Sequence, residues 1–186
     1  MSEDFSRLVS LACHDLRTPL ATIQGFAKTL LRQDVGDPAT RYLGIIDTAG
    51  DELVQLLDVL SIAARIEGGR YDPVLRVIDA LELAQAAIPG ATGEGAPVEV
   101  DVNPVERSLA AFARAASRHG GVEVSASVAG REVSIAPVVE DAGPIVLADD
   151  PKDLGAAVAV RIVRALGGEV KLEGVRLVIT LPAPAA

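Results

Sequence analysis

The segment Cys13-His14-Asp15-Leu16-Arg17-Thr18-Pro19-Leu20 decides how the rest of the chain is interpreted. His14 and Thr18 are four residues apart, so a helix would place both side chains on one face, one turn from each other. Asp15 follows the histidine directly, where a carboxylate can orient an imidazole or take its proton. Pro19 has no backbone N–H and strains a helix, so we expect a bend there.

Apolar residues recur at steps of three and four around this segment, which predicts two long helices. The first is expected over residues 2–32 and the second over residues 38–67. Asp37 is expected as the N-cap of the second helix, with Pro38 at its first position and Gly68-Gly69 at its end. Two helices with one apolar stripe each cannot bury both stripes alone, so we expect a dimer that closes a four-helix bundle. Packing of the stripes against the rest of the same chain is the alternative.

Composition limits the classes of function. The 186 residues carry a net charge of −9 and no basic run, which argues against binding nucleic acid or an anionic membrane surface. The single cysteine, Cys13, allows no internal disulfide and fits a reducing compartment; a packing role is favoured over a redox switch. No apolar run is long enough for a membrane span and the start of the chain lacks an apolar signal region, so we expect a cytoplasmic protein.

The sequence HDLRTPL at residues 14–20 resembles the H-box of two-component sensor histidine kinases. The continuation ATIQGFAKTLL at residues 21–31 is similar to the same helix of that family. The resemblance implies that His14 is the phospho-acceptor and Asp15 its orienting acid/base neighbour. It also implies that Thr18 positions a water when the family acts as a phosphatase, and that the hairpin forms a homodimer.

The partner surface is expected on the first helix around and after His14. It would comprise five residues that face a response regulator receiver domain, namely Arg17, Thr18, Ala21, Thr22 and Gly25. Small side chains there would let a regulator helix approach closely, although helix propensity alone can explain Ala21 and solvation can explain Thr22. Gly25 weakens a helix interior unless something packs close to it. An upstream histidine kinase is a further expected partner.

The second half of the chain alternates helical and strand patterns, which predicts an α/β sandwich with one mostly antiparallel sheet under helices. Residues 70–73 are expected as a linker between a hairpin domain over residues 1–69 and this domain over residues 70–186. The expected order is helix 77–87, loop 89–95, strand 97–102, helix 108–118, hairpin 122–128 with 131–139, helix 154–166 and hairpin 170–172 with 175–181. The fold class is therefore α+β.

This order resembles the ATP-binding domain that follows the hairpin in sensor histidine kinases. Asp141 and Gly143 fit the family's D-x-G-x-G adenine-binding stretch, whose last glycine is missing here. Gly155 matches the second glycine of the segment before the last helix, but Asp153 stands where the first would be. A carboxylate at the start of a helix repels phosphates. Asp141, Gly143 and Gly155 are therefore interpreted as vestiges of a nucleotide site.

The helix over residues 108–118 departs further from the family. The asparagines that it carries in the family, one of which holds Mg²⁺, align with Ala111 and Ala115. Alanine supplies no oxygen ligand for a hard cation. We therefore expect no cofactor or metal in this chain, with Mg²⁺ belonging to the partner regulator. His119, the other histidine, is expected to have a capping role at a helix end.

A retained phospho-acceptor beside a degenerate, pseudokinase-like domain resembles the dimeric histidine phosphotransferases of bacterial phosphorelays. The expected function is therefore transfer of a phosphoryl group between regulator aspartates through His14, without autophosphorylation from ATP. Two alternatives remain. One is a divergent sensor histidine kinase core with residual ATP binding, and the other is a non-catalytic dimeric scaffold with a kinase-like fold.

Overall fold

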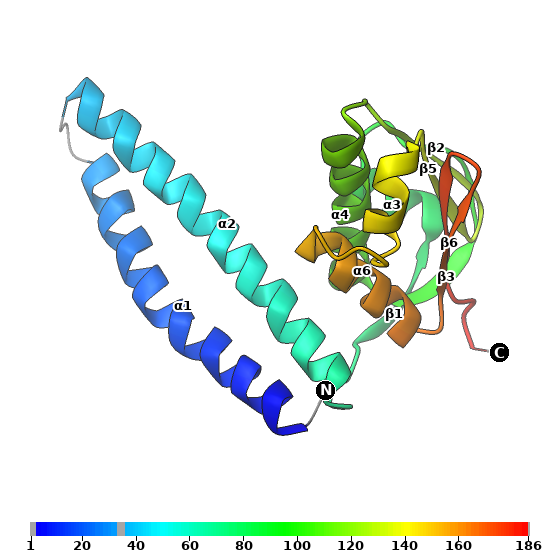
Figure 1. The fold of residues 1–186 in the computed structure, drawn as a ribbon, viewed down its shortest axis with the longest axis horizontal. Helices are drawn as coiled ribbons and strands as arrows, with labels where there is room; N and C mark the ends of the chain where they lie inside the picture. The colour runs from blue at the N-terminus through cyan, green and yellow to red at the C-terminus, as the bar shows by residue number, and fades with distance from the viewer. Residues whose placement is uncertain (1–2, 33–35, 186) are drawn as a thin grey trace. The chain divides into compact units, whose positions relative to one another are not determined.

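The fold is a helical hairpin followed by an α/β sheet domain (Figure 1). The computed structural model describes residues 3–32 and 36–185; the side chains of residues 3–8, 10–12 and 15 are outside this description. The chain divides into two compact units, Met1–Arg70 and Tyr71–Ala186. None of the helices in the described part is both long and apolar enough to cross a membrane.

The hairpin consists of α1, Glu3–Leu31, and α2, Asp37–Glu67. Helix α1 continues through Pro19. The N-cap of α2 is Gly36, with φ 83°, so the expectation that Asp37 is the N-cap is wrong. The helix begins one residue earlier than predicted because glycine adopts this conformation without steric cost, which leaves Asp37 as an acid in the first turn. Residues 33–35, which were expected in the turn, lie outside the described residues.

The hairpin has a narrow core. Cys13, Leu20 and Ala27 are seven residues apart on α1 and are only 1%, 7% and 3% exposed. This spacing places them in one stripe along the helix. On α2 the buried residues are Gly50, Ala63 and Ala64, all of them small. Of these, Gly50 lies against Gln24 of α1, where an added Cβ would come within 2.7 Å of Gln24 Cγ, so the glycine lets the two helices approach closely there.

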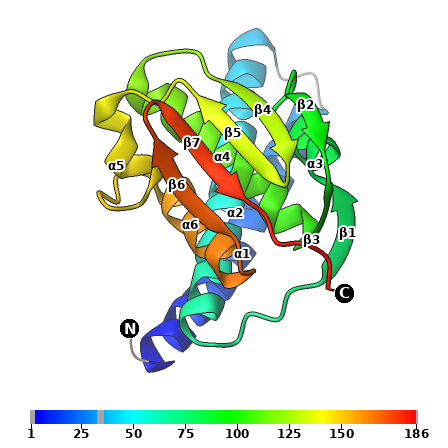
Figure 2. The ribbon, with the colours of Figure 1, turned by 90° about the vertical axis from the view of Figure 1, so that its right-hand side faces the viewer.

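The sheet domain contains a sheet, a separate strand pair and helices. Its elements are β1 Leu75–Asp79, α3 Ala80–Ala87, β2 Thr92–Gly95, β3 Pro97–Asp101, α4 Val102–Gly120, β4 Ser125–Gly130, β5 Glu132–Ala136, η1 Glu140–Ala142, α5 Gly143–Val146, α6 Leu154–Ala165, β6 Glu169–Glu173 and β7 Arg176–Thr180. The five-stranded sheet has the order β2-β4-β5-β7-β6, and Figure 2 shows helices α4 and α6 behind it. Neighbouring strands within this sheet are antiparallel, except β2 and β4, which are parallel.

The expectation of a single sheet is wrong, because β1 and β3 pair with each other in a two-stranded antiparallel ladder. The expected helix over residues 77–87 is also corrected, since its first residues belong to β1. The Asp79 carboxylate accepts the N–H groups of Leu81 and Glu82 at 2.8 and 3.3 Å. This N-cap explains why α3 begins only at Ala80.

The expected loop over residues 89–95 contains strand β2, which pairs in parallel with β4. Gly93 has φ 126° and lies against the backbone of Val128, where any side-chain atom would clash. A glycine that suggests a loop in sequence therefore allows a close approach of two backbones here. The core of the domain is apolar, and its largest fully buried side chains include Leu83, Val105, Leu109, Phe112, Val133, Ile135, Leu177 and Ile179.

Candidate functional site

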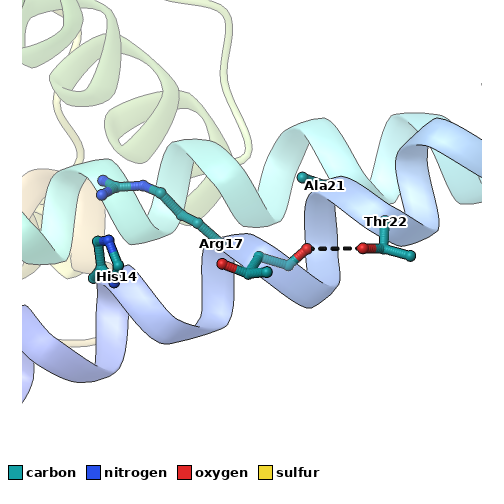
Figure 3. Close-up of a pocket in the computed structure, with 5 residues that line it drawn as sticks. His14, Arg17, Ala21 and Thr22 are labelled. Carbon is teal, nitrogen blue, oxygen red and sulfur yellow. Dashed lines mark hydrogen bonds between the residues drawn. The ribbon is translucent and has the colours of Figure 1, made fainter.

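His14 lies exposed on α1, in an open pocket of about 550 Å³. The lining residues all come from this helix and are His14, Arg17, Thr18, Ala21 and Thr22 (Figure 3). Steps of three and four residues place these side chains on adjoining turns. The structure thus brings the expected phospho-acceptor together with four of the five expected partner residues. Asp15 belongs to α1, but its side chain lies outside the described part of the chain.

Thr22 of this surface and Thr29, two turns further along α1, each donate a hydrogen bond to the backbone of the preceding turn. Thr22 Oγ1 donates to the carbonyl of Thr18 at 3.1 Å, and Thr29 Oγ1 donates to that of Gly25 at 2.7 Å. Thr18 itself is exposed and lines the same pocket as His14. Gly25 does not line the pocket but lies one turn beyond it, where an added Cβ would meet nothing within 4 Å.

Arg17 connects the pocket to the second helix. Its Nη2 donates to Oδ1 of Asp58 in α2 at 2.7 Å, and the two side chains are 41% and 31% exposed. Asp58 was not predicted as a site residue, because it belongs to no motif and lies 41 residues after Arg17 in the chain. The only indication in the sequence was the general expectation that an arginine at the interface of two helices pairs with an acidic residue on the facing helix.

The thiol next to His14 is a packing group. Cys13 is 1% exposed, and burial raises its pKa, with the Arg17 guanidinium acting in the opposite direction. A raised pKa keeps the thiol protonated and weakly nucleophilic. This geometry agrees with the packing role that the sequence analysis favoured.

A second stripe of α1 is apolar and exposed. Leu16, Ile23 and Leu30 are seven residues apart, and their exposed fractions are 54%, 54% and 39%. Phe26, between the last two, is 67% exposed. Helix α2 carries a matching row, comprising Tyr42, Ile46, Leu53 and Leu56. At 3.6 residues per turn, the α1 stripe lies roughly opposite the face that carries His14. We call these two rows the apolar seam.

In the sheet domain, the expected nucleotide residues occupy three separate elements. Asp141 is exposed in η1, Gly143 is buried at the start of α5, and Gly155 lies in the first turn of α6. The pKa of Lys152 is raised because its ammonium group donates a hydrogen bond to the Asp150 carboxylate, and the negative charges of Asp150 and Asp141 act in the same direction. The Asp141 carboxylate therefore has a lysine in its surroundings.

A cavity of about 300 Å³ opens beside η1, α5 and the β6–β7 turn. Gly143 is part of its wall, whereas Asp141 does not line it. The walls are mostly apolar, with Leu147, Leu172 and Val175 among them. The segment from the end of α5 to α6 covers only residues 147–153, which leaves no room for a long lid.

The alanines of α4 lie in the core, with Ala111 at 7% and Ala115 at 0% exposure. An added Cβ at Gly155 would lie 3.3 Å from Ala111 Cβ, so α4 and α6 are in close contact there. Across the described residues, no three His, Cys, Asp or Glu side chains gather as a cation site. Because an alanine side chain has no oxygen atom, Ala111 and Ala115 themselves cannot coordinate Mg²⁺ in the manner that the resemblance implies.

Asp153 has a structural role at the start of α6. Its Oδ1 accepts the N–H of Ala156 at 3.0 Å, and its Oδ2 lies 3.6 Å from Arg118 Nη1 and 3.5 Å from His119 Nε2. The carboxylate is 12% exposed, so it is the group that satisfies this helix end. His119 lies at the end of α4, where it faces this acid and Gly121 is the C-cap.

Comparison with known families supports the resemblance of the hairpin. Residues 6–69 match the model of the His Kinase A (phospho-acceptor) domain. Sensor histidine kinase TrcS of Mycobacterium tuberculosis is 37% identical over 92 residues, which cover 45% of this chain and 18% of that protein. Histidine protein kinase DivJ of Caulobacter vibrioides is 31% identical over 86 residues, covering 45% of this chain and 14% of that protein.

A sensor-like histidine kinase of Rhizobium meliloti is 30% identical over 90 residues, covering 45% of this chain and 17% of that protein. The matched segment thus spans less than a fifth of each of these curated relatives. Among solved structures, full-length ShkA in complex with AMPPNP superposes with a TM-score of 0.69 at 22% identity, covering 97% of this chain and 46% of that chain. Histidine kinase AdeS of Acinetobacter baumannii gives 0.51 at 20% identity, covering 90% and 95%.

These matches support a two-component sensor histidine kinase core. The expectation of a histidine phosphotransferase that works without ATP is wrong, because the matching family, the relatives and the similar structures are those of histidine kinases. The sequence argument placed too much weight on Ala111 and Ala115. Two substitutions in one helix change a binding site, but they do not by themselves assign a chain to another class of protein.

Proposed function

We propose that this chain is the core of a divergent sensor histidine kinase, in which His14 accepts a phosphoryl group and passes it to a response regulator. The match of residues 6–69 to the phospho-acceptor domain is the observation that carries this proposal. Its support from geometry is that His14 is exposed in an open pocket on the outer face of a helical hairpin.

Phosphoryl transfer requires of the acceptor residue only an accessible nucleophilic nitrogen. A lone pair on an imidazole nitrogen attacks phosphorus, and the leaving group departs on the opposite side with the electron pair of its bond. The helix holds the imidazole in place, so the encounter needs little further ordering. In this proposal Asp15 orients the ring, and Thr18, one turn after His14, positions a water for hydrolysis of a phosphorylated regulator.

The hairpin is proposed to act as a homodimer. The apolar seam leaves large side chains such as Leu16, Ile23 and Phe26 more than half exposed. A second copy of the hairpin would cover this seam and complete a four-helix bundle. Because the seam lies roughly opposite His14, the phospho-acceptor would stay accessible in such a dimer.

The receiver domain of a response regulator is proposed to bind beside His14. Thr18, Ala21 and Thr22 are exposed and short, and Gly25 extends this small-residue surface by one turn. A regulator helix could therefore approach α1 closely enough to bring its aspartate to the imidazole. Arg17 is the cationic member of this surface.

The nucleotide site is where the proposed kinase core differs most from the pattern of the family that it resembles. Ala111 and Ala115 supply no metal ligands, and Asp153 caps the helix start that the resemblance assigns to phosphates. Any nucleotide that this domain holds must therefore be bound by other contacts. We expect weaker binding and slower phosphorylation than a site with its own Mg²⁺ ligands would give.

The test is incubation of the full chain with Mg²⁺ and γ-³²P-labelled ATP. We expect slow incorporation of label with the acid lability and alkali stability of a phosphohistidine, and its loss in His14→Ala. His119→Gln is the matched control, because it changes the other histidine of the chain and should retain the label. A folded wild-type chain that gains no more label than His14→Ala would overturn the proposal.

A non-catalytic dimeric scaffold is a second candidate, and the burial of Ala111 and Ala115 favours it. A scaffold needs the seam and the regulator surface but no nucleotide. It would form a dimer and bind a receiver domain while neither ATP binding nor labelling of His14 is detected. Labelling of His14 from ATP would exclude it.

A further inference from the structure

We propose that Asp58 of α2 is a positioning residue for phosphoryl transfer at His14, and that it acts through Arg17. The inference rests on the proposed function, because it concerns the same histidine. It also extends the site beyond α1, since the lining residues of the pocket all lie on that helix.

The contacts that carry this proposal connect three side chains. Arg17 lies three residues after His14 and lines the same pocket, and Figure 3 shows its side chain running back toward the histidine. The guanidinium group also contacts α2, where Asp58 Oδ1 accepts a hydrogen bond from Arg17 Nη2 at 2.7 Å. Asp58 therefore holds the cation from the other helix of the hairpin.

The chemistry at His14 gives this cation a role. As the N–P bond forms and the bond to the leaving group breaks, the three remaining phosphoryl oxygens keep their negative charge. A guanidinium presents five N–H donors in a planar fork that matches such oxygens. An arginine that is 41% exposed would otherwise sample many rotamers, and a charge-assisted bond to Asp58 restricts them. Arg17 would then meet the phosphoryl group already oriented.

A purely structural role for this ion pair is the competing explanation, and the hairpin contains a control for it. Lys28 Nζ lies 3.5 Å from Asp47 Oδ1 and 3.8 Å from Asp51 Oδ1, which are further ion pairs between α1 and α2. None of these three residues lines the pocket. If the connection between the helices were all that mattered, loss of the Lys28 ammonium, which removes both pairs, should have the same effect as loss of the Asp58 carboxylate.

The experiment uses phosphoramidate, which phosphorylates an imidazole nitrogen and releases ammonia, so it needs neither nucleotide nor regulator. The rate of phosphohistidine formation on the full chain is followed by ³¹P NMR. We expect Asp58→Asn to slow it about fivefold to tenfold, and Asp58→Glu to recover most of the rate. Lys28→Gln should stay within about twofold of the wild type. Circular dichroism and melting curves verify that each variant is folded.

A double-mutant cycle completes the test. If Asp58 acts through Arg17, the Arg17→Ala/Asp58→Asn chain should be no slower than Arg17→Ala alone. Additive effects, an unchanged rate in Asp58→Asn, an equal loss in Lys28→Gln or no labelling of the wild-type chain would each overturn the inference. Labelling by phosphoramidate combined with no labelling by ATP would count against the proposed function and leave the role of Asp58 standing.

Discussion

The exposed face of α1 in the hairpin and the buried face of α4 in the sheet domain use small residues in opposite ways. On α1, Ala21 and Gly25 are exposed, and an added Cβ at Gly25 would meet nothing within 4 Å. In the sheet domain, Ala111 and Ala115 are buried on α4, and a Cβ at Gly155 would press against Ala111. The comparison teaches that a small residue indicates a partner surface only where the chain itself leaves the space empty. Where the space is filled, it indicates close helix packing.

Ala115→Asn should give the largest effect. The side chain is fully buried, so asparagine both overpacks the interior of the domain and buries an amide that lacks partners. We expect the free energy of unfolding of the sheet domain to fall by about 3 kcal/mol, measured by urea denaturation. Ala21→Asn on the hairpin is the matched control and should cost less than about 1 kcal/mol. An equal loss of unfolding free energy at both positions would contradict the contrast between the exposed surface of α1 and the packed interior around α4.

Asp153→Ala should give the next largest effect, because it removes the N-cap of α6 and the acid that faces Arg118 and His119. We expect a loss of about 1 to 2 kcal/mol in the same denaturation experiment. Asp150→Ala is the control, since Asp150 pairs only with the exposed Lys152 among the described ion pairs. If Asp150→Ala were as destabilising as Asp153→Ala, the capping role would be wrong.

Gly25→Ala should separate stability from function. Alanine in this exposed helical position should stabilise the hairpin by about 0.5 to 1 kcal/mol, because it restricts the unfolded chain and meets no neighbour. The added methyl group should nevertheless slow transfer to a receiver domain that packs against this turn. A variant that is more stable and transfers at the wild-type rate would show that no partner approaches Gly25.

The raised pKa of Cys13 should have the smallest effect of these on the stability of the protein. Burial raises the thiol pKa, with Arg17 opposing, so the thiolate forms only at higher pH than in the unfolded chain. The protonated, buried thiol contributes stability to the folded chain at pH values below the ordinary thiol pKa. This contribution is lost as the pH rises through the raised pKa of the folded state. We expect iodoacetamide at about pH 8 to modify the urea-unfolded chain but not the native chain. Rapid modification of the native chain would favour the redox interpretation.

Much of the fold is predictable from the sequence because its signals are local. The periodic apolar residues and Gly68 predicted the hairpin, and the alternating residues of 122–128 and 131–139 predicted the β4–β5 pair. The errors came from non-local packing. Strand β2 was missed because Gly93 serves a contact with Val128, 35 positions later, rather than a flexible loop. Strand β1 was missed because its apolar residues continue directly into α3.

The candidate site was only partly predictable for the same reason. His14 and the residues one to two turns after it belong to one helix, so spacing alone places them together. Asp58 reaches the site from α2, and no local pattern marks it. The phosphotransferase prediction was wrong because it was inferred from two residues of the sheet domain, whereas the family match and the relatives are those of histidine kinases. The sequence also did not show that Ala111 lies close to Gly155.

The measurement that tests the central claim most directly is the location of the phosphoryl group after incubation of the full chain with Mg²⁺–ATP. Tandem mass spectrometry at neutral pH assigns the modified residue. We expect it at His14, on the exposed outer face of α1 opposite the apolar seam. A phosphoryl group on any other residue, or none on a folded chain, would contradict the assignment of His14 as the phospho-acceptor of a kinase core.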